Sequence, residues 1–212
     1  MSRSPLYRLT LATVLAAVVL SMALGAWLAR RDGAAAAPPT LATLYPVPRP
    51  LPDFALVAHD GTRFDRSRLA GHWTLLFLGF TQCPDICPAT LMTLAAARRA
   101  LGMLPERLRP SIVLVSVDPA HDTPAALAAY VPRFDPAFVG ATGEATALAP
   151  LMGALGAYAS PVGGEAAGRI VHSGAVYLID PEARIAAVYT TLPAPLALAA
   201  DYRRVLRARG SS

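Results

Sequence analysis

The sequence contains no lysine, so all 19 of its basic residues are arginines. Charged residues make up only 16% of the 212 residues and hydrophobic residues 54%, which excludes global disorder and suggests one domain with appendages. The net charge of +5 would suit nucleic acid or anionic lipid. However, the arginines are scattered. Their C-terminal group suits a solvated helix end, where cations complement the helix dipole, so we expect no nucleic-acid partner.

Cysteine is almost absent, with only Cys83 and Cys87 in the chain. Two cysteines this close cannot cross-link distant parts of a fold, and a domain of this size does not need disulfides to fold. A pair of this kind more often does redox or metal chemistry. We therefore take the two cysteines as candidate functional residues.

The N-terminal region contains one long uncharged stretch, Leu9–Ala29. As a helix it would span roughly the ~30 Å hydrocarbon core of a bilayer, which predicts a transmembrane anchor over 9–29 after a cytoplasmic segment 1–8. A cleaved signal peptide is the alternative, with Ala34–Ala37 as the cleavage site, but the apolar run exceeds the usual ~7–15 residues. The Ala- and Pro-rich stretch 30–49 is predicted to be an extended linker to a domain over 50–209.

The domain pattern alternates strands with helices. An N-terminal hairpin turns at Asp60-Gly61, and two continuous apolar runs are typical of strands buried on both faces. The expected strands are 54–57, 62–64, 73–80, 112–117, 174–179 and 185–190, and the expected helices are 85–104, 123–130, 144–155 and 195–207, with a mobile loop over 160–168. This order predicts an α/β domain, and it matches the βαβ plus ββα arrangement of thioredoxin-like domains with an added N-terminal β-hairpin, a more specific name that needs a motif as well.

Three polar elements that are distant in sequence should meet at one edge of the sheet. Parallel strands 73–80 and 112–117 end at the same edge, where open α/β proteins build their sites. Cys83 and Cys87 follow the first strand, and Asp118 follows the second. His172 directly precedes strand 174–179, which begins at this edge if it runs antiparallel.

The cysteines form a C-x-x-x-C motif at a predicted helix start. Residues four apart share a helix face, and a helix N-terminus lowers thiol pKa values, so both sulfurs could act together as thiolates. Two thiolates and one imidazole suit Cu(I), while Zn(II) would need a further ligand. A reversible disulfide is the alternative chemistry for the pair.

The remaining candidates are polar residues near this edge. Asp118 could brace the following loop, tune the cysteines or contact a partner, and these three roles stay open. Asp122 is interpreted as a local structural residue. His59 and His72 are expected at the surface, with His121 a minor candidate because it lies near Asp118.

Three ordered motifs resemble the Sco/SenC family. The segment 79–88 (GFTQCPDICP) is similar to the family's cysteine signature, and 116–119 (SVDP) with 122–124 (DTP) is similar to its second block. The third block corresponds to 172–173 (HS) with 177–181 (YLIDP). The resemblance covers about 50–208. Two departures are Gln82, where many members have His, and His121, where a basic Arg is common.

The resemblance implies a thioredoxin-like fold and a single-pass anchor in a bacterial inner membrane, with the domain facing the periplasm. It implies copper bound by Cys83, Cys87 and His172, as Cu(I) with Cu(II) kept open, and a functional role for Asp118. The family role is to deliver copper to the binuclear copper site of cytochrome c oxidase subunit II, or to reduce the cysteines of that site. A periplasmic copper donor and a thiol reductant would be further partners.

Three other functions are alternatives to that of a copper chaperone, a protein that delivers copper. A general thiol-disulfide oxidoreductase would use C-x-x-C and a proline just before the strand that starts near Gly174, where this chain has His172-Ser173. A peroxiredoxin-like peroxidase is similar only in the P-D-I-C-P segment. A membrane-tethered copper or redox sensor would use the same residues. We expect a metallochaperone more than an enzyme, with Cys83 and Cys87 as the redox pair if reductase activity exists.

Overall fold

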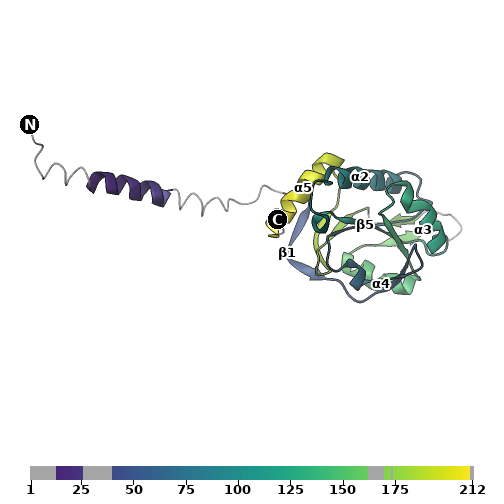
Figure 1. The fold of residues 1–212 in the computed structure, drawn as a ribbon. Coiled ribbons are helices and arrows are strands. Elements are labelled where there is room, and N and C mark those ends of the chain that lie inside the picture. Colours follow the sequence, from purple (N-terminus) through teal and green to yellow (C-terminus); the bar gives the residue numbers. More distant parts are fainter. Residues whose placement is uncertain (1–12, 26–39, 162–169, 173, 211–212) are drawn as a thin grey trace, which may run out of the picture. The chain divides into compact units, whose positions relative to one another are not determined.

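The computed structural model describes residues 13–25, 40–161, 170–172 and 174–210 (Figure 1). The chain divides into two compact units, Met1–Pro39 and Thr40–Ser212. In the first unit, residues 13–25 form a helix. Among the described residues, no helix combines the length and apolar character that crossing a bilayer requires. The predicted anchor over 9–29 lies partly outside these residues and stays a prediction.

The second unit is built on an eight-stranded mixed sheet with the order β1-β10-β9-β4-β5-β6-β2-β3. Its strands are β1 (Thr43–Pro50), β2 (Ala55–Ala58), β3 (Arg63–Asp65), β4 (Thr74–Gly79), β5 (Ser111–Ser116), β6 (Val139–Thr142), β9 (Val176–Ile179) and β10 (Arg184–Tyr189). β4, β5 and β6 run parallel, while β9 pairs antiparallel with β4. A separate antiparallel pair joins β7 (Ala159–Pro161) to β8 (Ile170–His172).

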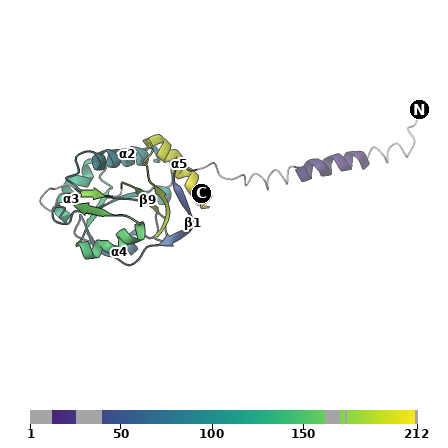
Figure 2. The same ribbon diagram turned by 180° about the vertical axis from the view of Figure 1, so that it is seen from behind.

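Helices cover both faces of the sheet. They are α2 (Ile86–Ala100), α3 (Pro124–Tyr130), α4 (Ala145–Leu155) and α5 (Pro195–Ala208), with short 3-10 helices η1 (Arg66–Leu69), η2 (Glu106–Leu108) and η3 (Val131–Arg133). Figures 1 and 2 show α2 and α5 side by side over one face and α4 over the other. Every residue of β4 is buried, as its continuous apolar run predicts.

Local signals in the sequence set several element boundaries. Thr123 caps α3 by accepting a hydrogen bond from the Ala126 N–H at 3.2 Å, and Pro124 occupies the first helical position. α4 ends at Gly156, whose φ of +63° is readily adopted only by glycine. The predicted hairpin, buried strands and helices are confirmed, although α2 ends at Ala100, before the predicted Leu104.

Among the described residues, four strands were missed by the sequence interpretation, namely β1, β6, β7 and β8. β1 lies in the stretch predicted to be mostly linker, but it pairs antiparallel with β10 at the edge of the sheet, where strand prolines are tolerated. The four-residue β6 includes Gly140 and has no apolar run to signal it. The predicted loop 160–168 begins within β7, and its residues 162–168 lie outside the described residues.

The start of the domain is fastened to its last helix by one buried carboxylate. Asp201, in α5, is fully buried and accepts hydrogen bonds from the backbone N–H groups of Leu41 at 2.8 Å and Ala42 at 3.2 Å. These two donors lie directly before β1. The carboxylate therefore holds the first residues of the domain against α5.

We predict that Asp201→Ala lowers the free energy of unfolding by about 1–3 kcal/mol, because it leaves two backbone donors without their acceptor. Urea denaturation of the full chain measures this loss. The control is Asp53→Ala at an exposed aspartate, which should change stability by less than about 0.5 kcal/mol. Equal stability of the two variants would contradict the assignment.

Candidate metal centre

The ends of three central strands form the edge where the candidate residues gather. β4 ends at Gly79 beside Ser116, the last residue of parallel β5. Val176, the first residue of β9, pairs with Phe77 near the same end of β4. The antiparallel direction of β9 is therefore as predicted, and the chain enters β9 at the edge from which the cysteine loop leaves β4.

The two cysteines lie close together, although only one belongs to the helix. Cys83 lies in the loop before α2, and Cys87 lies in the first turn of α2. The Cys87 N–H donates a hydrogen bond to Cys83 Sγ at 3.4 Å. Both residues are buried and neither forms a disulfide. A turn that folds Cys83 back onto the helix start thus brings the residues together, rather than the helical repeat that the sequence suggested.

Burial controls the acidity of Cys87. Loss of solvent raises the pKa of this thiol far above its ordinary value, and the hydrogen bond with Cys83 and the charges of Cys83 and Asp122 raise it further. A backbone hydrogen bond with Phe80 acts in the opposite direction. The expectation that the helix N-terminus lowers the thiol pKa is wrong for Cys87 in the metal-free chain, because desolvation outweighs the helix dipole.

Gly79 leaves the space that the Cys87 side chain occupies. A Cβ placed on Gly79 would lie 3.1 Å from Cys87 Sγ, 3.0 Å from Leu114 Cδ1 and 2.9 Å from Phe77 Cε1. These distances are shorter than ordinary van der Waals contacts. The absence of a side chain at the end of β4 therefore lets the sulfur pack against the backbone of the strand.

A buried carboxylate joins the loops that follow β4 and β5. Asp122 is fully buried and accepts hydrogen bonds from the Thr81 N–H at 2.9 Å, from the Thr81 hydroxyl, and from Ser116 Oγ at 2.6 Å. Thr81 lies two residues before Cys83. Asp122 is the local structural residue that the sequence suggested, but its link to the cysteine loop, across 41 positions, was not foreseen.

Asp118 is largely buried and faces His121. Both carboxylate oxygens lie close to His121 Nδ1, at 3.0 and 2.9 Å, and the Asp118 N–H donates to Ser116 Oγ at 3.0 Å. The His121 side chain is 46% exposed. Asp122, rather than Asp118, is the carboxylate whose charge acts on Cys87. A role for Asp118 toward copper or a partner stays a prediction.

The other histidines lie in different settings. His172 is the last residue of β8 and pairs with Ala159 in β7, but its side chain is outside the described part of the structure. His59 is partly buried, and its Nδ1 accepts the Gly140 N–H at 3.1 Å. His72 Nδ1 lies 3.1 Å from the Ala70 carbonyl oxygen. Within the described residues, no three His, Cys, Asp or Glu side chains form a metal-binding group.

One residue near the cysteines was absent from the sequence-based candidates. Tyr130 ends α3, and burial followed by the charges of Cys87, Cys83 and Asp122 raises its pKa to about 12. Burial and these charges both keep the phenol protonated. No motif marks Tyr130, and only the packing of α3 in the folded domain could have shown its position.

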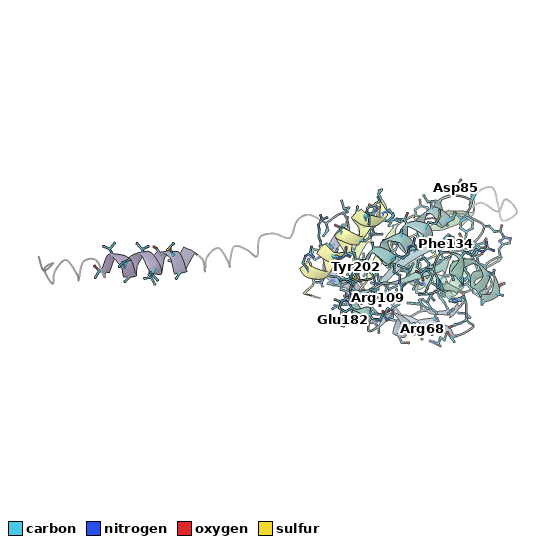
Figure 3. The ribbon with its side chains drawn as sticks, turned by 45° about the horizontal axis from the view of Figure 1, so that its top comes forward. Arg68, Asp85, Arg109, Phe134, Glu182 and Tyr202 are labelled. Carbon is cyan, nitrogen blue, oxygen red and sulfur yellow. The ribbon has the colours of Figure 1, made fainter. Side chains whose placement is uncertain are left out.

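A cavity of about 530 Å³ lies elsewhere in the domain. It is lined by residues of β3, η1 and the turn before β10, including Asp65, Arg66 and Glu182. Figure 3 shows Asp85, which lies between the two cysteines in sequence, far from Arg68 and Glu182. Because the cavity lining includes no cysteine or histidine, the cysteine edge is the stronger candidate for a metal centre.

A family model described as SCO1/SenC matches residues 47–207. A Stutzerimonas stutzeri protein whose name refers to copper binding is 38% identical over 142 residues, which cover 66% of this chain and 68% of that protein. The mitochondrial SCO2 homologue of Bos taurus is 37% identical over 132 residues, covering 61% of this chain and 50% of its own length. The chain thus spans about half the length of that mitochondrial relative.

Solved structures of similar fold include two with bound copper. Arabidopsis thaliana ScoI with copper bound is 31% identical with a TM-score of 0.69, covering 74% of this chain and 98% of that one. Bradyrhizobium japonicum ScoI with copper bound is 31% identical with a TM-score of 0.65, and the match covers 74% of this chain and 99% of that one. The domain therefore has the α/β, thioredoxin-like Sco fold with a mixed sheet.

We predict that Gly79→Ala lowers the free energy of unfolding by about 1–3 kcal/mol, because the new methyl group must displace Cys87 Sγ or the strand side chains. Urea denaturation measures the change. Gly153→Ala is the matched control in α4, since a Cβ there meets no atom within 4 Å. The control should stabilise by about 0.5–1 kcal/mol. Similar effects of both substitutions would show that Gly79 does not confine the sulfur.

We also predict that Cys87 in the folded, metal-free Cys83→Ser variant ionises only well above the ordinary thiol pKa. Burial, the largest cause of the raised pKa, remains in this variant. Thiolate ultraviolet absorbance, measured against a Cys83→Ser, Cys87→Ser variant, reports the titration. The urea-unfolded chain should titrate near the ordinary pKa of about 8.5. A folded midpoint at or below the unfolded one would refute the effect of burial.

Proposed function

The chain belongs to the SCO1/SenC family, and from this premise we propose that it is a copper chaperone acting in cytochrome c oxidase assembly. Its cargo would be Cu(I), held by Cys83, Cys87 and His172. The observation that carries the proposal is the pair of buried, unbridged cysteines, joined by the Cys87 N–H to Cys83 Sγ hydrogen bond, at the edge where β4 ends. Two copper-bound relatives with this fold support it.

The donor atoms fit copper better than a hard cation. Sulfur ligands select Cu(I) over oxygen-preferring ions such as Mg²⁺ and Ca²⁺, and imidazole also suits copper. The His172 backbone lies in β8, three residues before Ala175, which leads into β9 at the cysteine edge. Gln82 is exposed and supplies no thiol or imidazole, so its presence leaves the ligand set intact.

The surroundings of the cysteines suit binding that is coupled to proton release. Thiolates rather than thiols bind metals, so copper must replace the protons that burial retains on Cys87. The Cys87 N–H donates a hydrogen bond to Cys83 Sγ, and the Asp122 hydrogen bonds fix the loop that carries Cys83. These groups would keep the two sulfurs in place whether or not copper is present.

The partners and location follow from the family resemblance and are part of the proposal. The chain would be anchored by its N-terminal segment in a bacterial inner membrane, with the domain in the periplasm. There it would receive copper from a periplasmic donor and deliver it to the binuclear copper site of cytochrome c oxidase subunit II. A thiol reductant would keep Cys83 and Cys87 reduced, because a disulfide between them would remove both sulfur ligands.

A second candidate function is reduction of the cysteines of that oxidase site. The close pair of unbridged cysteines supports it, because oxidation to a Cys83–Cys87 disulfide would supply two electrons. The raised pKa of Cys87 disfavours this residue as the attacking nucleophile, because the thiolate attacks, but it does not bear on attack by Cys83. The copper-bound relatives with this fold favour the chaperone.

We predict that the reduced full-length chain binds one Cu(I), and that Cys83→Ser and Cys87→Ser each abolish tight binding. His172→Ala should weaken binding at least about tenfold, the equivalent of about 1.4 kcal/mol, because it removes one of three ligands. An anaerobic titration against a competing Cu(I) chelator measures these affinities.

The matched control is His72→Ala, which removes an imidazole that lies near the Ala70 carbonyl rather than the cysteines. Its Cu(I) affinity should equal that of the unmodified chain. Unchanged affinity in His172→Ala would remove His172 from the site. Rapid turnover of protein disulfides without Cu(I) uptake would instead favour the reductase.

A further inference from the structure

The last helix, α5, carries three arginines close together. Arg203, Arg204 and Arg207 lie within little more than one turn of this helix, and we call them the arginine face. Arg207 is exposed, and the other two are partly exposed. Val205 and Leu206, which lie between them in sequence, are buried in the core. The apolar residues therefore hold α5 against the domain and leave the arginines on its outer side.

Most of the positive charge of the arginine face is not neutralised within the domain. Arg204 Nη1 lies 3.6 Å from Asp201 Oδ1. Arg203 donates to the Ala100 carbonyl oxygen at 2.7 Å, an acceptor without net charge. No ion pair in the described part of the chain involves Arg207. The helix dipole favours cations at this end of α5 but does not cancel their charge, so the face presents net positive charge to solvent.

The elements beside the arginine face add one free cation and a paired carboxylate. The backbone hydrogen bond of Arg203 places the end of α2 beside α5, and the last turn of α2 contains the exposed Arg99. Tyr202 donates a 2.8 Å hydrogen bond to the backbone of η2. The carboxylate of η2, Glu106, is paired with Arg109. The positive character of the face therefore continues onto its surroundings.

The arginine face lies where the chain enters the domain. The Leu41 N–H donates to Asp201 Oδ1, the same oxygen that Arg204 Nη1 approaches. Figures 1 and 2 show β1, which begins two residues later, at the same end of the domain as α5. Leu41 is 56% exposed. An exposed leucine beside arginines suits the boundary between lipid headgroups and acyl chains.

The predicted anchor ends close to this face along the chain. Residues 30–39 separate its last residue, Ala29, from Thr40 at the start of the domain. A fully extended chain spans no more than about 3.6 Å per residue, so this segment reaches at most about 35 Å. An anchored chain would hold the arginine face near a bilayer and raise its local concentration there.

We propose that the arginine face docks on the anionic phospholipid headgroups of the bilayer that the N-terminal segment would enter. This inference rests on the membrane anchor of the proposed function, because the tether supplies the proximity. Guanidinium groups bind phosphate through paired hydrogen bonds, and each basic residue near an anionic surface strengthens binding about fivefold.

Docking would set where the cysteines lie relative to the membrane. α2 contains Cys87 in its first turn and Arg99 in its last turn, beside the arginine face. Twelve residues of helix separate the two, a length of about 18 Å. The cysteine pair would therefore be held at the end of α2 that is away from the docked face.

The test measures how fast single arginines react with phenylglyoxal, an arginine-specific reagent, in the full-length chain reconstituted into vesicles and purified by flotation. One set of vesicles is phosphatidylcholine, and the other also contains anionic phosphatidylglycerol. Peptide mass spectrometry should show that Arg204 and Arg207 react at least about fivefold more slowly in the anionic vesicles. High salt should remove this difference, because it screens the attraction between arginines and headgroups.

Arg133 is the matched control. It is exposed and lies in η3, directly after α3, and Figures 1 and 2 show α3 on the opposite side of the domain from α5. Its reaction rate should be the same in both vesicles. Arg207→Gln should reduce the protection of Arg204 by up to about fivefold, whereas Arg133→Gln should leave that protection unchanged.

The possible results separate this inference from the proposed function. Equal rates at Arg207 in both vesicles, in chains that float with the lipid, would overturn the docking and leave the anchor intact. Equal slowing of Arg207 and Arg133 would show that lipid contact is not confined to the arginine face, which also overturns the inference. Chains that float with neither vesicle would refute both the anchor and the docking. A Cu(I) titration of the same preparations tests the chaperone separately.

Discussion

The hydrogen bonds of the Asp122 carboxylate are the constraint on which the candidate site depends. They join Thr81, in the loop after β4, to Ser116 at the end of β5, through a carboxylate in the loop that follows β5. Cys83 lies two residues beyond Thr81, and its sulfur accepts the Cys87 N–H at the start of α2. The Asp122 link therefore adds a long-range attachment to the local hydrogen bonds of the Cys83 loop, which include that of the Cys83 N–H with the Phe80 carbonyl oxygen at 3.4 Å.

The same region combines strong packing with polar groups that are costly to bury. Cys87 Sγ lies against the backbone at Gly79, and burial keeps its thiol protonated in the metal-free chain. Tyr130 adds a hydroxyl without a partner. Buried polar groups usually find hydrogen-bond partners, so the unpaired hydroxyl adds to the free-energy cost of this part of the fold.

The outer strands show how the rest of the fold supports this edge. β1 extends the sheet beside β10, and Asp201 fixes the residues just before β1 to α5. α5 in turn packs beside α2, whose first turn contains Cys87. The start of the domain and the cysteine helix are therefore connected through α5.

The sequence by itself determined much of the architecture and the identity of the chemistry. Continuous apolar runs defined β4 and β5, Thr123-Pro124 and Gly156 marked helix ends, and three ordered motifs indicated the family and the cysteines. These features depend on local spacing, because secondary structure and capping involve residues a few positions apart.

Only the tertiary structure decided which distant groups meet. It joined Asp122 to Thr81, added β1 and β6 to the sheet, and reversed the expected pKa shift of Cys87. Each of these depends on packing and on removal of water by residues far away in the chain. Local sequence spacing does not encode desolvation or such contacts, which is why the cysteine motif was visible from the sequence and its supporting residues were not.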